Sequence, residues 1–178
     1  MRASILRKLA PIAFITLVVL ISVTLLAFTQ SFTSKQLAAQ EHQQVVEKLG
    51  AMFPDMSDYD FIDGLYILYA SQTKIGYAFM ATGNGYGGDI SILVALDDAE
   101  AVKGIVILSQ QETPGIGARI TGDEFTGQFA GMDIDDINLR QNGGQIDGIT
   151  GATISSTAVV NAVREAALEK IKQIEGLN

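Results

Sequence analysis

The feature that most constrains this chain is an apolar run near its N-terminus. Residues Leu9 to Phe28 contain no charged side chain. As an α-helix with a rise of about 1.5 Å per residue, this run would span roughly 30 Å, the thickness of the hydrocarbon core of a bilayer. Pro11 would fall in the first turn of that helix, where its missing N–H costs little. The run therefore predicts one N-terminal transmembrane helix over residues 9–29.

A cleaved signal peptide is the alternative to a retained anchor, since Arg2, Arg7 and Lys8 supply the basic segment that a signal peptide requires. The apolar run is longer than the roughly 7–15 residues usual in a signal peptide, and no clear cleavage site follows it closely. The retained anchor is therefore favoured. Because the next cation is Lys35, the positive-inside rule keeps residues 1–8 in the cytoplasm. The rest of the chain is then expected on the outer, periplasmic face of the cell membrane.

The composition beyond the anchor excludes several classes of partner and cofactor. All 20 acidic residues and nine of the 12 basic residues follow the apolar run, which gives this part a net charge of −11. Such a surface does not suit nucleic acid, because phosphate contacts need clustered Lys or Arg. The absence of cysteine excludes disulfides, thiolate metal sites, Fe–S clusters held by this chain and c-type haem attachment. The single histidine, His42, lies in a polar stretch and is interpreted as a solvated side chain, so no metal site is expected.

The remaining residues are predicted to form a linker and one globular domain. Residues 30–56 form the linker, with a helix over 33–52 that ends before Pro54. Residues 57–178 form the domain. Within it, stretches rich in β-branched and aromatic residues predict strands over 65–69, 74–81, 91–96 and 102–109.

Helical and turn patterns complete the predicted domain. The link over 97–100 is short enough for a hairpin, a short helix is expected around 123–129, and one further short strand over 145–149. A final helix over 156–175 places its apolar residues on one face. The order of elements predicts an α+β fold, an antiparallel sheet with packed helices.

The segment Asp147–Ser156, which reads DGITGATISS, opens the final helix. It delivers hydroxyls and backbone N–H groups to a helix N-terminus. A phosphate can be held there, because the N–H groups of the first turn are unpaired and the helix dipole favours an anion. Gly151 and Ala152 leave space for a bulky group to approach the backbone. Plain capping, with Thr153 or Ser155 as the N-cap residue, explains the same residues and is favoured on this physics alone.

The same segment fits a family pattern, Asp-x-x-[Ser/Thr]-Gly-Ala-[Thr/Ser], through Asp147, Thr150, Gly151, Ala152 and Thr153. The pattern resembles the flavinylation signature of the FMN-binding domain family, which includes the G subunit of the Rnf ion-translocating complex and the C subunit of the sodium-pumping NADH:quinone reductase. In that family the last hydroxyl residue forms a phosphoester with FMN. The resemblance therefore implies FMN attached covalently to Thr153, with Ser155 as a further binding residue.

Two glycine-rich loops add to the resemblance. The loop Glu112–Arg119 (ETPGIGAR) is similar to the family's Glu-Thr-Pro-Gly-Leu-Gly loop, with Ile116 where Leu is usual. It implies cofactor contacts by Glu112, Thr113, Gly115, Ile116 and Gly117, although alone it reads as an ordinary strand-to-helix turn. The loop 85–90 (GYGGDI) resembles the family's Gly-Tyr-Gly-Gly-x-Ile loop. It adds Tyr86 and Gly87 to the candidates, with capping of the sheet as the alternative for Tyr86.

The resemblance covers roughly residues 40–175 and implies a function. It implies a membrane-anchored electron-transfer subunit with covalent FMN, in an Rnf-type complex that couples ferredoxin oxidation to ion transport. The other subunits of that complex and a separate flavin transferase are the implied partners. The short chain favours the G subunit of the Rnf complex over the longer C subunit of the quinone reductase. A stand-alone flavinylated electron-transfer protein and a non-enzymatic scaffold module are the alternatives. Because the sequence shows no Ser/His/Asp set and no nucleophilic Cys, no autonomous catalytic site is expected.

Overall fold

The computed structural model describes residues 14–25, 28, 42–97 and 101–176. The chain divides into two compact units, Met1–Val45 and Val46–Asn178. In the first unit, residues 14–25 form a helix whose side chains are exposed. Within the described ranges, no helix combines the length and the apolar character needed to cross a bilayer. The predicted segment 1–8 and both ends of the predicted span over 9–29 lie outside the described residues.

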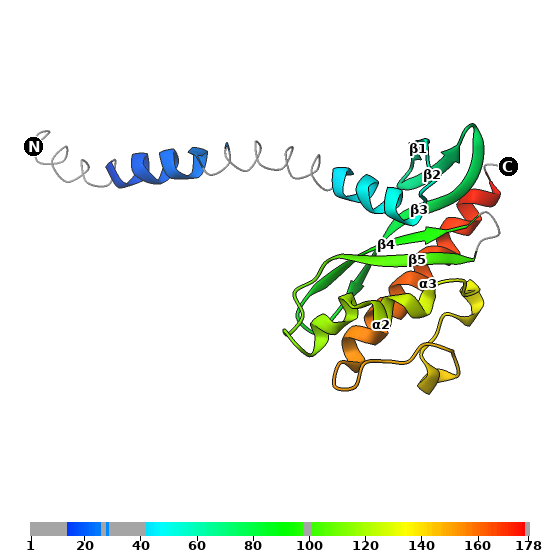
Figure 1. Ribbon diagram of the computed structural model, residues 1–178. Coiled ribbons are helices and arrows are strands. Elements are labelled where there is room, and N and C mark those ends of the chain that lie inside the picture. Colours follow the sequence, from blue (N-terminus) through cyan, green and yellow to red (C-terminus); the bar gives the residue numbers. More distant parts are fainter. Residues whose placement is uncertain (1–13, 26–27, 29–41, 98–100, 177–178) are drawn as a thin grey trace, which may run out of the picture. The chain divides into compact units, whose positions relative to one another are not determined.

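The second unit is built on a five-stranded antiparallel sheet in which each strand pairs with its neighbour in sequence, in the order β1-β2-β3-β4-β5 (Figure 1). The strands are β1 (Asp58–Ile62), β2 (Leu65–Ala70), β3 (Thr73–Asn84), β4 (Asp89–Leu96) and β5 (Val102–Ser109). The predicted α+β fold, with an antiparallel sheet and packed helices, is confirmed. Residues 98–100 of the predicted hairpin link lie outside the described residues.

Strand β1 is absent from the sequence-based prediction. It lies at the sheet edge with mostly exposed side chains, so it carries no buried apolar alternation that would mark it. The signal that could have found it is the turn that follows. Asp63 and Gly64 both adopt positive φ angles, 49° and 77°, as the two-residue turns of tight hairpins require. An Asp-Gly pair before an apolar stretch is one of the strongest short-range hairpin signals.

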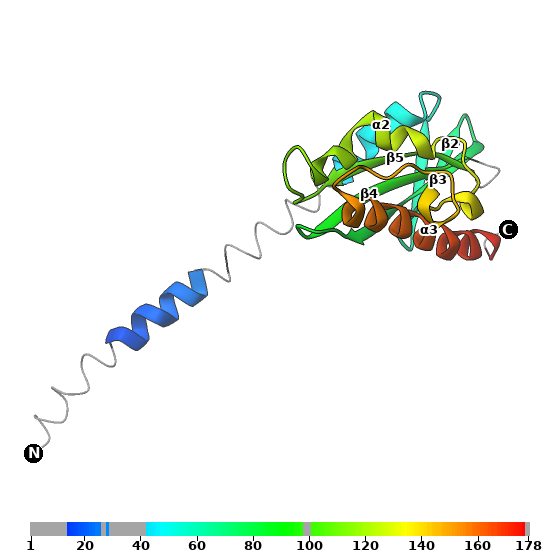
Figure 2. The ribbon, with the colours of Figure 1, turned by 90° about the horizontal axis from the view of Figure 1, so that it is seen from below.

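Helix α3 (Thr153–Glu175) runs along one face of the sheet (Figure 2). Its buried apolar residues, which include Val159, Val160 and Val163, pack with alternate residues of β3 and β4 such as Phe79 and Ile92 in one core. The apolar stripe predicted over residues 156–175 is therefore the face that contacts the sheet. The helix begins three residues earlier than predicted, at Thr153.

An irregular segment between β5 and α3 closes the same core. It contains the short helices η1 (Gly117–Thr121), α2 (Asp123–Thr126), η2 (Gly127–Phe129), η3 (Ile134–Asp136) and η4 (Arg140–Asn142). Phe125 and Phe129 are buried there with their rings edge to face, 5.7 Å between centroids. The helix expected around 123–129 is thus present as α2 followed by η2.

The prediction of a strand over residues 145–149 is wrong. Only Ile146 pairs with another backbone segment, in an isolated bridge to Leu139. The flanking backbone donors bond to side chains instead: the Asp147 N–H donates to Gln128 Oε1 and the Ile149 N–H to Ser156 Oγ. These side-chain contacts satisfy the backbone that a sheet partner would otherwise pair.

The opposite face of the sheet is covered by residues 46–53, at the end of a helix over 42–52. Leu49 and Phe53 are buried, and the Phe53 ring lies against Gly76 on β3. The described part of the predicted linker is therefore helical over residues 42–52, and it packs on the domain from residue 46 onward. Residues 30–41 of that linker lie outside the described residues.

Close packing of α3 on β3 depends on Gly83. A Cβ built there would lie 2.6 Å from the Ala158 carbonyl oxygen, a backbone atom of α3 that cannot move alone. Gly83→Ala is expected to lower the free energy of unfolding by about 1–3 kcal/mol through overpacking. Gly127→Ala is the control, since Gly127 has helical φ and ψ angles and a Cβ there meets nothing within 4 Å. Equal stability of the two variants in chemical denaturation would contradict this packing.

Candidate functional site

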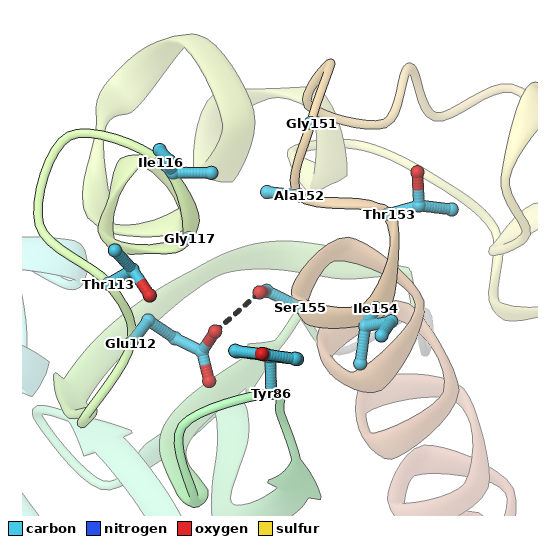
Figure 3. A pocket seen from close by; sticks show the side chains of 10 residues that line it. All are labelled: Tyr86, Glu112, Thr113, Ile116, Gly117, Gly151, Ala152, Thr153, Ile154 and Ser155. Atoms are coloured by element: carbon cyan, nitrogen blue, oxygen red, sulfur yellow. Dashed lines mark hydrogen bonds between the residues drawn. The ribbon is translucent and has the colours of Figure 1, made fainter.

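The three motif segments of the sequence meet around one cavity of about 410 Å³ (Figure 3). This volume falls in the range of about 300–1,000 Å³ that is typical of ligand pockets. The loop after β3, the loop after β5 and the first turn of α3 each contribute walls. The lining residues are Tyr86, Glu112, Thr113, Ile116, Gly117, Gly151, Ala152, Thr153, Ile154 and Ser155.

Thr153 is the first residue of α3 and is exposed at the cavity. Ala152 is the N-cap residue, and no side chain caps the helix. Capping by Thr153 or Ser155, the alternative that the sequence leaves open, is therefore not what this segment does. No hydrogen bond joins the Thr153 hydroxyl to any described residue, and Figure 3 shows it pointing away from the helix. The hydroxyl is thus accessible for modification.

The backbone around Thr153 is suited to an anion. The first hydrogen bond of the helix runs from the Ser156 N–H to the Ala152 carbonyl, at 2.9 Å. The N–H groups of residues 153–155 precede that bond and so have no partner within the helix. Gly151 adopts a φ of 83°, the left-handed region, which turns the chain sharply into the helix start. A phosphate at Thr153 would lie where unpaired donors and the helix dipole favour negative charge.

The other hydroxyls of this segment are either hydrogen-bonded in the protein interior or lie at a different cavity. Ser155 is 2% exposed, and its Oγ donates to Glu112 Oε2 at 2.6 Å. Ser156 is fully buried, and its Oγ donates to the Ala152 carbonyl and accepts from the Ile149 N–H. Thr150 lines a different cavity. Of the four hydroxyl residues in DGITGATISS, Thr153 alone both lines the large cavity and is exposed.

Glu112 joins the three segments at the base of the cavity. Its carboxylate accepts a hydrogen bond from Ser155 on α3 and another, at 2.9 Å, from the Gly87 N–H in the loop after β3. Gly85 and Gly117 leave room for this side chain, because a Cβ at either position would collide with the carboxylate. One glycine of each loop, Gly85 and Gly117, is therefore required by a single buried side chain.

Four predicted site residues lie outside the lining of the large cavity. Gly87 acts through its N–H on Glu112, and a Cβ at Gly115 would meet open space. Asp147 and Thr150 line a smaller cavity of about 150 Å³. The structure brings the other predicted residues together: Tyr86, Glu112, Thr113, Ile116, Gly117, Gly151, Ala152, Thr153 and Ser155.

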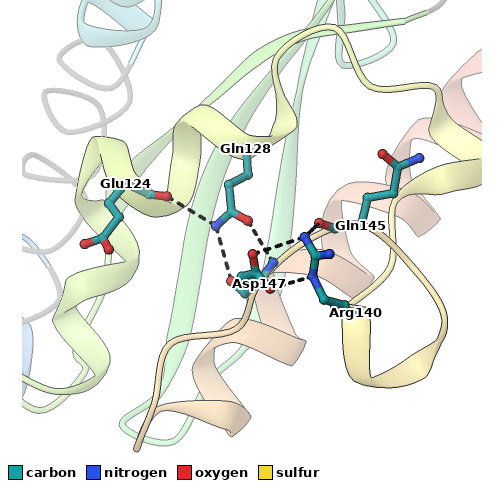
Figure 4. A network of polar contacts seen from close by, with 5 residues as sticks. All are labelled: Glu124, Gln128, Arg140, Gln145 and Asp147. Atoms are coloured by element: carbon teal, nitrogen blue, oxygen red, sulfur yellow. Dashed lines mark hydrogen bonds and ion pairs between the residues drawn. The ribbon is translucent and has the colours of Figure 1, made fainter.

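Asp147 is held in a polar network (Figure 4) and does not line the large cavity. Its two carboxylate oxygens accept from Arg140 Nε and Nη2, at 2.7 and 3.2 Å. Its backbone N–H and carbonyl both bond to the Gln128 side-chain amide. These contacts anchor the loop that leads into Thr153, so the aspartate of the pattern contributes to the shape of the loop.

Ile154 lines the cavity but is absent from the sequence-based candidates. It is 57% exposed and, with Ile116 and Tyr86, forms a rim of exposed apolar side chains. A signal for it was present in the sequence. At 100° per residue, Ile154 falls on the helix face opposite the buried stripe that includes Val163 and Ala167, where an apolar residue has no packing role.

Comparison with known proteins agrees with these motifs. Residues 85–168 match the FMN-binding domain family, and this range contains all three motif segments. The G subunit of the ion-translocating oxidoreductase complex of Methanosarcina acetivorans is 34% identical over 168 residues, which cover 85% of this chain and 89% of that protein. The chain belongs to the family of these G subunits.

Other members of the G-subunit family agree. The G subunit of the proton-translocating ferredoxin:NAD(+) oxidoreductase complex of Clostridium ljungdahlii is 32% identical over 168 residues, 91% of this chain and 90% of that protein. Among solved structures, the C subunit of the Na(+)-translocating NADH-quinone reductase from Parabacteroides distasonis gives a TM-score of 0.48 at 23% identity, over 57% of each chain. The family expected from the Asp147–Thr153 pattern is confirmed by the G subunits.

Proposed function

We propose that this chain carries FMN on Thr153 through a phosphoester and acts as an electron-transfer subunit of an Rnf-type complex that couples ferredoxin oxidation to ion transport. The observation that carries the proposal is the position of Thr153. It combines an unbonded hydroxyl, the N-terminus of a long helix and the wall of a ligand-sized cavity. FMN supplies the ability to take up and release electrons one or two at a time.

The cavity offers separate places for the two chemical parts of FMN. Thr153 and the unpaired N–H groups of residues 153–155 would bind the phosphate end. The apolar rim of Tyr86, Ile116 and Ile154 offers surface for a flat aromatic ring. Glu112 and Thr113 add polar groups among the lining residues. The residues present therefore fit FMN.

The surroundings of Thr153 support attachment by a separate flavin transferase. Ester formation joins the Thr153 oxygen to the FMN phosphorus while another P–O bond of the flavin donor breaks and its leaving group departs. Relative to free FMN and free Thr153, the product lacks the elements of one water, and the hydroxyl proton must be taken up by a base. Thr153 has no hydrogen-bonded base among the described residues, and the nearby Glu112 carboxylate is bonded to Ser155 and Gly87. The catalytic groups are then supplied by another protein.

A covalent link also suits a domain outside the cytoplasm. There, no pool of FMN would replace a cofactor that dissociates, whereas a tethered cofactor rebinds at high effective concentration. The neighbouring subunits of the complex are the proposed electron donor and acceptor. The likeness of the chain to G subunits over about nine-tenths of their length supports this assignment.

Purification from native membranes tests the proposal. The chain should carry flavin absorbance that survives acid precipitation, and it should co-purify with polytopic membrane subunits. A colourless native chain would favour a scaffold module. Covalent flavin on a chain without such partners would favour the stand-alone electron-transfer protein.

The membrane topology gives a further prediction. We propose that residues 9–29 span the membrane and that the domain lies on the outer face, because Arg2, Arg7 and Lys8 precede the apolar run. Protease added to intact spheroplasts should then cleave the domain while a cytoplasmic marker survives. Protection in spheroplasts, with cleavage only in inverted vesicles, would show the opposite orientation.

A further inference from the structure

Glu112 is a buried acid whose charge has no counter-ion among the described residues. It is 5% exposed, the lowest exposure of any acidic residue in the described chain. The ion pair of Arg119 with Glu124 and that of Arg140 with Asp147 do not involve Glu112. Burial of an unpaired charge is costly. A buried, unpaired acid at the wall of the candidate cavity is therefore a candidate for a functional role.

The carboxylate is held in place by neutral groups. One oxygen accepts from the Gly87 N–H at 2.9 Å and the other from Ser155 Oγ at 2.6 Å. These bonds orient the charge without cancelling it. The space for the carboxylate exists only because positions 85 and 117 are glycines. The arrangement fixes a negative charge beside the cavity, where solvent screens it weakly.

We propose that the Glu112 carboxylate sets the reduction potential of the flavin by opposing its uptake of electrons. This inference rests on the proposed function, since it requires FMN in the cavity. Reduction adds negative charge to the flavin, and a fixed negative charge nearby makes that uptake less favourable. Glu112 thereby keeps the flavin a stronger reductant than the same cavity would with a neutral side chain. It acts on the cofactor electrostatically and takes no part in bond making.

A purely structural role for Glu112 predicts a different result. Glu112→Gln keeps the size of the side chain, an oxygen for the Gly87 N–H and a polar group for Ser155, but removes the charge. If Glu112 only joined the loops, this variant would hold flavin at an unchanged potential. If its charge acts on the flavin, the variant should hold flavin at a higher potential.

The test is a spectroelectrochemical titration of the purified, flavinylated full-length chain. For Glu112→Gln we expect a rise on the order of tenfold in the reduced-to-oxidised ratio at fixed potential, equivalent to about 30 mV for a two-electron couple. Glu124→Gln removes one charge from a side chain that is 93% exposed and absent from the cavity lining, and should leave the potential unchanged. An unchanged potential in Glu112→Gln, an equal rise in Glu124→Gln, or loss of flavin from folded Glu112→Gln would overturn the inference.

Ser155→Ala provides an independent measurement. It keeps the Glu112 charge and removes one of the two hydrogen-bond donors to the Glu112 carboxylate. The negative charge is then less compensated, so the reduction potential of the flavin should fall. If Glu112→Gln gives no folded chain, Ser155→Ala decides alone, and an unchanged or higher potential would contradict the inference. A wild-type chain without flavin would refute the proposed function instead. The two failures are therefore distinguishable.

Discussion

Thr153→Val is expected to give a folded chain without covalent flavin. The substitution keeps the branched shape of the side chain and removes the one oxygen that a phosphoester needs. Because Thr153 is exposed and its side chain does not cap α3, the cost in stability should stay within about 0.5 kcal/mol. The purified chain should be colourless after acid precipitation, and electron transfer through the complex should fall sharply.

Two controls accompany the Thr153 variant, made in cells that also produce the flavin transferase. Thr150→Val changes a neighbouring hydroxyl that lines the smaller cavity, and Ser155→Ala removes one that is buried against Glu112. Both should keep covalent flavin. If the Thr153→Val chain still carried flavin, the attachment site would have to move to another hydroxyl.

Gly117→Val should damage the flavin site without touching the attachment residue. A Cβ at Gly117 would lie 2.6 Å from Glu112 Oε2, 2.9 Å from Glu112 Cβ and 3.0 Å from Ser155 Oγ. The valine would therefore break the contact that joins the loop after β5 to α3. We expect a loss of about 1–3 kcal/mol in stability. Flavin incorporation should fall, and any flavin that remains should show altered absorbance fine structure.

Gly115→Ala separates this effect from backbone strain. Gly115 has a φ of 75°, so alanine costs about 1–2 kcal/mol there, but its Cβ would meet nothing within 4 Å. Normal flavin content and spectrum are expected in this variant. If Gly115→Ala disturbed the flavin spectrum as much as Gly117→Val, the Glu112 contact would not explain the role of the loop.

The sequence predicts most of this fold because its elements have strong local patterns. The stripe from Val159 to Ile174 marks α3, and β-branched runs mark β2 to β5. Edge strand β1 lacks such a pattern because its side chains are mostly exposed. The backbone around Ile146 is satisfied by the side chains of Gln128 and Ser156. Contacts of that kind depend on the tertiary structure and leave no local periodicity.

In the candidate site, too, the sequence predicts local motifs but not the contacts made by the tertiary structure. Family motifs single out Thr153 and both glycine loops, and they imply direct cofactor contacts by Gly87, Gly115 and Gly117. In the structure, Gly85 and Gly117 leave room for the Glu112 side chain, and the Gly87 N–H donates to its carboxylate. Glu112 in turn accepts a hydrogen bond from Ser155, 43 positions further along the chain. Spacing along the chain cannot reveal such a pairing, because the sheet and α3 bring the two residues together.

The most direct measurement of the central claim is mass spectrometry of the native, membrane-purified chain, intact and after proteolysis. The account predicts an intact mass that exceeds the sequence mass by one FMN less one water. It also predicts that the modified peptide fragments to place the addition on Thr153. An unmodified native chain, or FMN located on Thr150, Ser155 or any other residue, would contradict it.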